Sequence, residues 1–227
     1  HVAILMGAAQ LLAELKEDMP GTFKFVFQPP EEGAPLGEEG GAEMMVAEGV
    51  LENPNVDAAF ALHISANEDA GRIGYAACTR YASVDDFKIT VTGVQAHGAS
   101  PWMGVDSIVV SAQIINALQT IVSRNLEITE QAGIVTVGSI HGGVRSNIIP
   151  EQVEMIGTIR ALDNDMRLLI HKRVREIAEG VAHSMGASVD VQIPMSSSYP
   201  ITYNDAQLAS EMLPVLENIP TVRGVTW

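Results

Sequence analysis

The order of apolar segments between residues 83 and 193 restricts this chain to few folds. In 83–92, Phe87, Ile89 and Val91 alternate with charged residues and threonines, which is typical of a strand with one solvated face. Strands are expected at 83–92, 133–140, 153–161 and 187–193, and amphipathic helices at 106–124 and 163–185. The order strand–helix–strand–strand–helix–strand is that of a ferredoxin-like split unit.

The segments before residue 71 follow a different order, in which helices and strands alternate. Helices are expected at 2–16 and 42–50, and short apolar strands at 22–28 and 56–64. Such alternation is typical of an α/β layer built on a largely parallel sheet. We therefore expect an α/β protein in which a ferredoxin-like α+β domain at 74–197 is inserted into a partial α/β domain formed by 1–73 and 198–227.

Composition excludes some partners. The formal net charge is −15, and no run of basic residues occurs, so nucleic acid and anionic membrane surfaces are not expected partners. The apolar start of the chain lacks a basic flank and is too short to span a bilayer. The single cysteine, Cys78, is expected to be buried and inert, and it suits a reducing compartment such as the cytoplasm.

The end of the strand expected at 22–28 carries the first candidate for chemistry. Pro29 and Pro30 stop the strand, and Glu31 and Glu32 follow directly. Ligands and catalytic groups gather at the carboxyl edge of such sheets. Adjacent carboxylates there repel each other unless a cation or a shared proton relieves them. The alternative is a solvated acidic loop, a feature that the chain also has at 38–39.

His63 ends the next expected strand and completes this candidate group. Carboxylate and imidazole are ordinary ligands for zinc or a similar divalent ion. The two acids could divide the work, one as a ligand and the other as the base that deprotonates the attacking water. A strand-end histidine with no metal is the competing interpretation, because no compact ligand motif is present.

Three later residues are weaker candidates. His97 lies in a loop of small residues, Asn147 precedes Ile148, and Arg160 lies at the end of an expected strand. The competing interpretations are a turn histidine, a turn-forming asparagine and a surface ion pair. The remaining histidines, His141, His171 and His183, are expected to be ordinary loop and helix-surface residues.

Taken together, several stretches resemble one enzyme family. They are HVAILMGAA at 1–9, FQPPEEG at 27–33, ALH at 61–63, GVQAHGASP at 93–101, SNIIPE at 146–151 and GTIR at 157–160. In this order they are similar to the zinc-dependent aminoacylase/carboxypeptidase family. The nearest match is its amidohydrolase branch of hippurate hydrolases, N-acyl-amino-acid amidohydrolases and auxin-conjugate hydrolases.

The resemblance implies a role for each candidate. Glu31 would be the general acid/base, and Glu32 and His63 would bind a divalent metal, zinc first, with manganese, cobalt or nickel as alternatives. The ferredoxin-like domain would be a lid and dimerisation domain, so a homodimer is expected. In related enzymes the histidine that matches His97 reaches the active site of the partner subunit and stabilises the oxyanion.

The resemblance also implies how the substrate is held. Asn147 matches a lid asparagine near the substrate, and Arg160 matches an arginine that binds the substrate carboxylate, which suits its bidentate fork. The expected reaction is hydrolysis of the amide bond of an N-acyl amino acid, with hippurate-like substrates, which releases a carboxylic acid and an amino acid. The alternatives are a dipeptidase or carboxypeptidase of the same family, or a non-catalytic dimerising module.

The chain departs from the family pattern at both ends. The family's Cys-Gly-His-Asp motif would precede His1, and its late acidic segment and final ligand histidine would follow Trp227. Of the usual ligand set only Glu32 and His63 are present. We therefore expect a chain truncated at both ends, which by itself is not a competent hydrolase.

Overall fold

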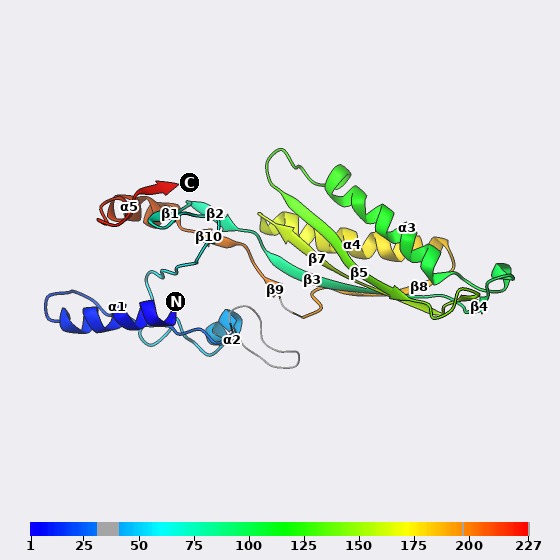
Figure 1. The fold of residues 1–227 in the computed structure, drawn as a ribbon, viewed down its shortest axis with the longest axis horizontal. Helices are drawn as coiled ribbons and strands as arrows, with labels where there is room; N and C mark the ends of the chain where they lie inside the picture. The colour runs from blue at the N-terminus through cyan, green and yellow to red at the C-terminus, as the bar shows by residue number, and fades with distance from the viewer. Residues whose placement is uncertain (31–40, 197, 227) are drawn as a thin grey trace. The chain divides into compact units, whose positions relative to one another are not determined.

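The computed structural model describes residues 1–30, 41–196 and 198–226. The chain divides into two compact units, an N-terminal unit (His1–Asp69) and a C-terminal unit (Ala70–Trp227), shown in Figure 1. The structure is mixed α/β, as the sequence predicted. The predicted domains, 1–73 with 198–227 and 74–197, have different boundaries from these units and stay a prediction.

The N-terminal unit contains two helices, α1 (Val2–Glu14) and α2 (Gly41–Ala47), both close to their predicted positions. The strands predicted at 22–28 and 56–64 are not formed, because neither segment pairs with another strand among the described residues. An apolar pattern favours an extended chain, but a strand also requires a neighbour for its backbone N–H and C=O groups.

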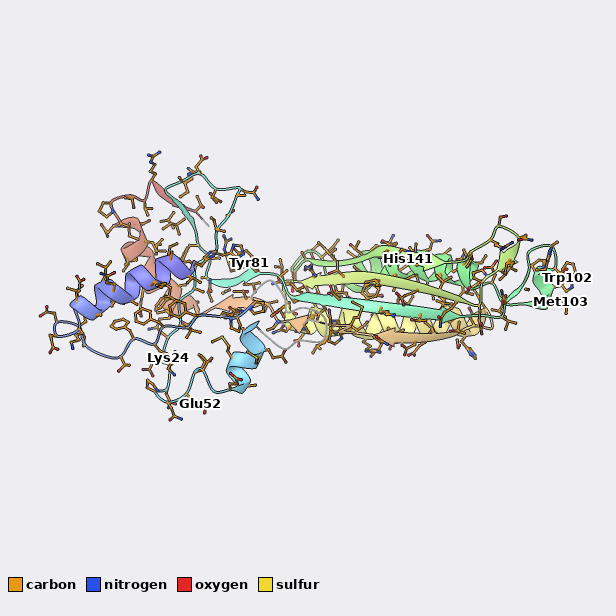
Figure 2. All side chains as sticks on the ribbon, turned by 60° about the horizontal axis from the view of Figure 1, so that its bottom comes forward. Lys24, Glu52, Tyr81, Trp102, Met103 and His141 are labelled. Carbon is orange, nitrogen blue, oxygen red and sulfur yellow. The ribbon has the colours of Figure 1, made fainter. Side chains whose placement is uncertain are left out.

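Lys24 connects the segment 22–28 by hydrogen bonds to the turns that follow α2. Its ammonium group donates to the carbonyl oxygens of Val50, Glu52 and Pro54 at 3.0, 2.6 and 3.0 Å (Figure 2). These three bonds use the full donor capacity of a lysine. Lys24 therefore links two parts of the N-terminal unit that no strand pairing joins within the described residues.

The C-terminal unit is built on an antiparallel sheet. Its main strands are β3 (Val84–Thr92), β5 (Gly133–Gly142), β7 (Gln152–Ala161) and β8 (Ser188–Gln192), in the order β5-β7-β3-β8. Two helices connect them, α3 (Ser107–Thr120), continued by the π-helical turn η2 (Ile121–Asn125), and α4 (Asn164–Ser184). In Figure 1 both helices lie on one side of this sheet. The strand–helix order is the one predicted from the sequence.

The core lies between this sheet and the two helices. Phe87, Ile89 and Val91 on β3 are fully buried and belong to one cluster with Ile114 of α3 and Val174 of α4. Their alternation with half-buried neighbours leaves the other face of the sheet more open. Both helices begin at aspartate caps, whose carboxylates accept backbone N–H groups of the first turn.

Short pairings complete the C-terminal unit. These are β1 (Arg72–Gly74) with β11 (Gly224–Thr226), β2 (Cys78–Tyr81) with β10 (Thr202–Asn204), β4 (Ala96–His97) with β6 (Ile148–Ile149), and β9 (Ser198–Tyr199) with β3. The unit also has η1 (Pro101–Met103) and α5 (Ala206–Glu217). In the described part of the chain, parallel pairing occurs only between β1 and β11, so the largely parallel sheet is seen only as this pair.

Asp85 is the centre of a buried polar cluster at the start of β3. Its carboxylate is fully buried and accepts two hydrogen bonds of 2.7 Å from Arg167 and one of 2.7 Å from Ser198 of β9. The Nε2 atom of His171 lies 3.1 Å from the same carboxylate, but no hydrogen bond forms, so the contact is electrostatic when the imidazole is protonated. The prediction of an ordinary surface role for His171 is wrong, because α4 turns this residue toward β3.

These contacts decide the ionisation of Asp85. Burial is the largest single influence, and it raises the pKa of the Asp85 carboxyl. The hydrogen bonds from Arg167 and Ser198, with the charges of His171 and Arg167, outweigh burial, so the pKa of Asp85 lies below its ordinary value. The same hydrogen bond raises the pKa of Arg167. The cluster therefore fixes β9 on β3 with an ionised pair.

No helix in the described part of the chain is both long and apolar enough to cross a membrane.

Candidate active site

The acidic pair Glu31–Glu32 lies outside the described residues, so its geometry is not part of this structure. Among the described residues, no group of three or more histidine, cysteine, aspartate or glutamate side chains is placed to hold a metal ion. The described candidate ligand is His63, which is exposed in the N-terminal unit.

A local hydrogen bond sets the tautomer of His63. Its Nδ1 atom lies 2.5 Å from the backbone oxygen of Ile64. A carbonyl oxygen only accepts hydrogen bonds, so this contact requires the proton on Nδ1 and leaves the lone pair of the neutral ring on Nε2. Metal-binding histidines are commonly oriented in this way, with one nitrogen donating to a carbonyl and the other binding the ion.

His97 has the opposite tautomer. Its Nδ1 atom accepts a hydrogen bond of 3.1 Å from the backbone N–H of Ala99. The neutral ring therefore carries its proton on Nε2, and the exposed side chain can donate from that atom to an oxygen. In their neutral forms the two candidate histidines therefore differ in tautomer, with the proton on Nδ1 in His63 and on Nε2 in His97.

The loop that carries His97 is held by several backbone contacts. Val94 and Val105 exchange two hydrogen bonds of 3.0 Å, and Gly93 donates to Glu151 at 2.7 Å. A side chain at Gly104 would place its Cβ only 2.4 Å from the carbonyl oxygen of Val94. The small residues of this loop are therefore required by close backbone packing, which the sequence indicated only as a small-residue stretch.

Asn147 lies beside His97. The backbone N–H of Gly98 donates to the carbonyl oxygen of Asn147 at 2.8 Å, and His97 pairs with Ile148 in the β4–β6 ladder. Gly98 approaches so closely that a Cβ there would lie 3.2 Å from the carbonyl carbon of Asn147. The structure thus brings together two predicted site residues that are fifty positions apart in the sequence (147 − 97).

Arg160 is near the end of β7 on the more open face of the sheet. Its Nη1 atom donates to the hydroxyl of Thr158 and to the carbonyl oxygen of Ile159, the latter at 2.8 Å. Thr158 in turn donates to the carbonyl oxygen of Asp85 at 3.2 Å. Among the described residues Arg160 forms no ion pair, so the surface ion pair that the sequence left open is not found there.

A small depression lies next to Arg160. It has a volume of about 190 Å³ and is otherwise lined by Ala82, Ala132, Ile134, Ala161 and Leu162. A guanidinium group with remaining donors at the rim of an apolar depression can bind a carboxylate while an apolar group packs beside it.

His97 and Arg160 lie at opposite ends of the sheet. Gln152 of β7 pairs with the last residue of β3, and His97 lies beyond that end, as Figure 1 shows for β4. From Gln152 to Arg160 the strand rises about 26 Å, at about 3.3 Å per residue. This distance is far longer than an acylated amino acid, so His97 and Arg160 of one chain cannot contact the same small substrate.

Cys78 does not fit its predicted environment. The side chain is exposed, and the Tyr203 hydroxyl lies 3.7 Å from its sulfur. The hydrogen bond and the charge of Cys78 raise the pKa of Tyr203. The prediction that Cys78 is buried is wrong, because β2 and β10 form a two-stranded ladder and leave this position at its surface.

Comparison with known proteins defines the class. The model of peptidase family M20/M25/M40 matches residues 1–223. The chain belongs to this family, which confirms the resemblance drawn from the motifs.

Two curated relatives illustrate the family's range. Thermostable carboxypeptidase 2 of Saccharolobus solfataricus is 36% identical over 222 residues, which are 98% of this chain and 55% of that protein. N-acetyldiaminopimelate deacetylase of Streptococcus thermophilus is 36% identical over 223 residues, 98% of this chain and 56% of that protein. Both names are those of hydrolytic enzymes, and the chain spans about half the length of each.

Solved structures also match the fold of this chain. An aminohydrolase from methicillin-resistant Staphylococcus aureus matches with a TM-score of 0.85 at 30% identity, over 96% of this chain and 55% of that chain. The YXEP protein of Bacillus subtilis, described as a dinuclear metal-binding peptidase of family M20, matches with a TM-score of 0.76 at 28% identity, over 100% of this chain and 55% of that chain.

Proposed function

We propose that the protein hydrolyses the amide bond of N-acyl amino acids with the help of a bound divalent metal, zinc in the first place. Family membership and the deacetylase relative support this reaction. The products are a carboxylic acid and a free amino acid. The ferredoxin-like part of the C-terminal unit is proposed as a lid and dimerisation domain, and the small number of cysteines is in keeping with a cytoplasmic enzyme.

Glu32 and His63 would hold the metal, which polarises the scissile carbonyl and lowers the pKa of the attacking water. The tautomer of His63, with its lone pair on Nε2, supports this assignment. Glu31 would take the proton from the attacking water and deliver it to the leaving nitrogen, which keeps the proton count balanced. His97 would donate from Nε2 to the developing oxyanion, a contact that strengthens as charge accumulates.

The substrate is proposed to be held by its carboxylate on Arg160, with Asn147 beside the reacting amide. Thr158 and Ile159 orient Arg160, so little side-chain entropy remains to be lost on binding. The separation of His97 and Arg160 along β7 then supports the proposal of a homodimer. Because one chain cannot bring His97 and Arg160 to one substrate, we propose that each site uses Arg160 of one copy and His97 of a second copy.

A complementation experiment tests this arrangement. His97→Ala homodimers should lose about a hundredfold or more in kcat/KM, the typical effect of removing an oxyanion donor. Arg160→Gln homodimers should also lose kcat/KM, because the substrate carboxylate then lacks its bidentate partner. Heterodimers of the two variants should regain about half of the wild-type activity per dimer, because one site then has both residues. Heterodimers as inactive as the homodimers would contradict a shared site.

The assignment of Glu31 is tested separately in the protein as encoded. Glu31→Gln should abolish turnover of N-acyl amino acids while the metal content by atomic emission stays at the wild-type level. Glu38→Gln is a matched control, since it removes an acid of the same glutamate-rich stretch and should leave turnover unchanged. Retained activity in Glu31→Gln would exclude its role as the base.

A second reaction, peptide hydrolysis by a carboxypeptidase, is favoured by the Saccharolobus solfataricus relatives, two of which are 36% identical to this chain. A panel that compares N-acyl amino acids with dipeptides of the same C-terminal residue separates the two. Higher kcat/KM for dipeptides would replace the amidohydrolase proposal with the carboxypeptidase. A protein with no metal and no hydrolysis would instead be a non-catalytic dimerising module.

A further inference from the structure

Trp102 and Met103 stand side by side on the surface at the end of the C-terminal unit (Figure 2). Their exposed fractions are 76% and 70%, and they occupy the single turn η1, which has no buried residue. An exposed tryptophan next to an exposed methionine is unfavourable in water and commonly marks a binding surface. Nothing proposed so far uses these two side chains.

The backbone of this loop is held by several hydrogen bonds. Met103 donates its backbone N–H to Ser100 at 3.1 Å, and Gly104 donates to Pro101 at 3.2 Å. The same loop is tied to the rest of the unit by the Val94–Val105 bridge. A backbone held at so many points presents the two apolar side chains in a defined position, with little entropy to lose when a ligand covers them.

The same loop carries His97. Ser100 donates its backbone N–H to the carbonyl oxygen of His97 at 2.8 Å, so η1 starts one turn after the catalytic candidate. In the proposed reaction His97 donates to the oxygen of the acyl carbonyl. The substituent of that carbonyl carbon is two bonds from this oxygen, whereas the carboxylate held by Arg160 lies on the other side of the amide.

We infer that Trp102 and Met103 form the apolar wall that receives the acyl group of the substrate, and that the preferred acyl groups are aromatic or long aliphatic ones. This inference rests on the proposed function, because it takes His97 to act on the acyl carbonyl. Tryptophan supplies a large flat face and methionine an adaptable one, a combination that fits a benzoyl or hexanoyl group and adds nothing for acetyl.

Kinetics with one amino acid and three acyl groups test the inference. For N-acetyl-, N-hexanoyl- and N-benzoylglycine, Trp102→Ala in the protein as encoded should lower kcat/KM for the two larger acyl groups by about tenfold or more, the scale of a lost apolar contact. The N-acetyl substrate should change less than twofold. Trp102→Phe should retain most of the preference in kcat/KM for the two larger acyl groups over acetyl. Leu168→Ala, which changes an exposed leucine of α4, is the matched control and should leave the ratios of kcat/KM between the three substrates unchanged.

A binding measurement independent of turnover completes the test. In protein labelled with 5-fluorotryptophan, the ¹⁹F resonance lost in Trp102→Phe belongs to Trp102. N-benzoylglycine should shift this resonance in the Glu31→Gln protein, and N-acetylglycine should not. A Trp102 resonance that shifts with protein concentration and ignores N-benzoylglycine shows that a second copy covers the loop, and overturns the inference.

The outcomes separate the two proposals. If the wild type hydrolyses all three substrates and Trp102→Ala lowers kcat/KM equally for each, the acyl-wall inference is overturned and the amidohydrolase function still stands. A ¹⁹F shift by N-benzoylglycine in a protein that hydrolyses none of the substrates supports the wall and overturns the function.

Discussion

The two units of this chain differ in how far their apolar residues are buried. In the C-terminal unit, strands and helices enclose one continuous cluster in which Phe87 and Ile89 are fully buried. In the N-terminal unit, Gly41 is the one described residue that is buried, and Ile4 and Leu62 are 61% and 72% exposed. Both units nevertheless show the apolar patterns of core elements.

The difference shows what such a pattern does and does not specify. In the C-terminal unit the patterned faces meet each other within the chain, so the pattern and the core coincide. In the N-terminal unit α1 has an apolar sequence with no buried residue. An apolar pattern therefore identifies residues suited to burial, while the element that buries them is a property of the tertiary structure.

The largest effect is expected from the buried ion pair of the C-terminal unit. Asp85→Ala should lower the free energy of unfolding by about 3–5 kcal/mol, because the partly buried Arg167 then lacks its fully buried partner. Urea unfolding of the 227-residue chain measures the loss. Asp86→Ala, on the other face of β3, is the control and should cost far less. The double variant Asp85→Leu/Arg167→Met should recover part of the loss, and a further additive loss would contradict the explanation.

The same carboxylate predicts a pH dependence. The pKa of Asp85 is lower in the folded protein than its ordinary value of 3.8, so folding favours the ionised form. Its contribution to stability is complete above pH 3.8 and is lost as the pH falls through the lower folded-state pKa. Unfolding curves between pH 7 and pH 2 should show this loss in the wild type and a weaker one in Asp85→Ala.

A matched pair of isoleucines compares the two units directly. Ile89→Ala should cost about 2–5 kcal/mol, because it removes a fully buried side chain from the core and leaves a cavity. Ile4→Ala should change stability by about 0.5 kcal/mol or less, as expected for an exposed position. Equal costs in urea unfolding would show that α1 is buried in solution and would remove the contrast.

Two glycines give the next largest contrast. A Cβ at Gly157 would lie 2.2 Å from Cζ of Phe87 and 2.3 Å from the carbonyl oxygen of Thr136, so Gly157→Ala should cost about 1–3 kcal/mol. At Gly7 a Cβ meets nothing within 4 Å, so Gly7→Ala should stabilise α1 by about 0.5–1 kcal/mol. Thermal unfolding followed by circular dichroism measures both, and a destabilised Gly7→Ala would reveal a neighbour packed on α1.

The smallest loss of stability is expected from removing the hydrogen bonds of Lys24 in the N-terminal unit. Lys24→Met should cost about 1–2 kcal/mol locally, because three carbonyl oxygens lose one shared donor. Limited proteolysis should detect faster cleavage near residues 50–54. Lys16→Met is the control, since the interaction of Lys16 among the described residues is an exposed ion pair with Glu17. Equal cleavage in both variants would show that the Lys24 contacts do not hold the turns.

Some features were readable from local sequence alone. The helices α1, α3 and α4 and the strand–helix order of the C-terminal unit follow from the periodicity of their apolar residues. The burial of Asp85 was not readable, because the sequence pattern set the charged residues of this strand against its apolar face. Its partner Arg167, 82 residues away, was not readable either.

The sequence by itself therefore determined the family, the helices and the identity of the candidate residues, because these depend on short motifs and on the periodicity of neighbouring residues. Only the tertiary structure placed His97 beside Asn147 and Arg160 at the opposite end of the sheet. The physical reason is that strand register and backbone hydrogen bonds join positions far apart in the chain. These long-range contacts decide which side chains can act together.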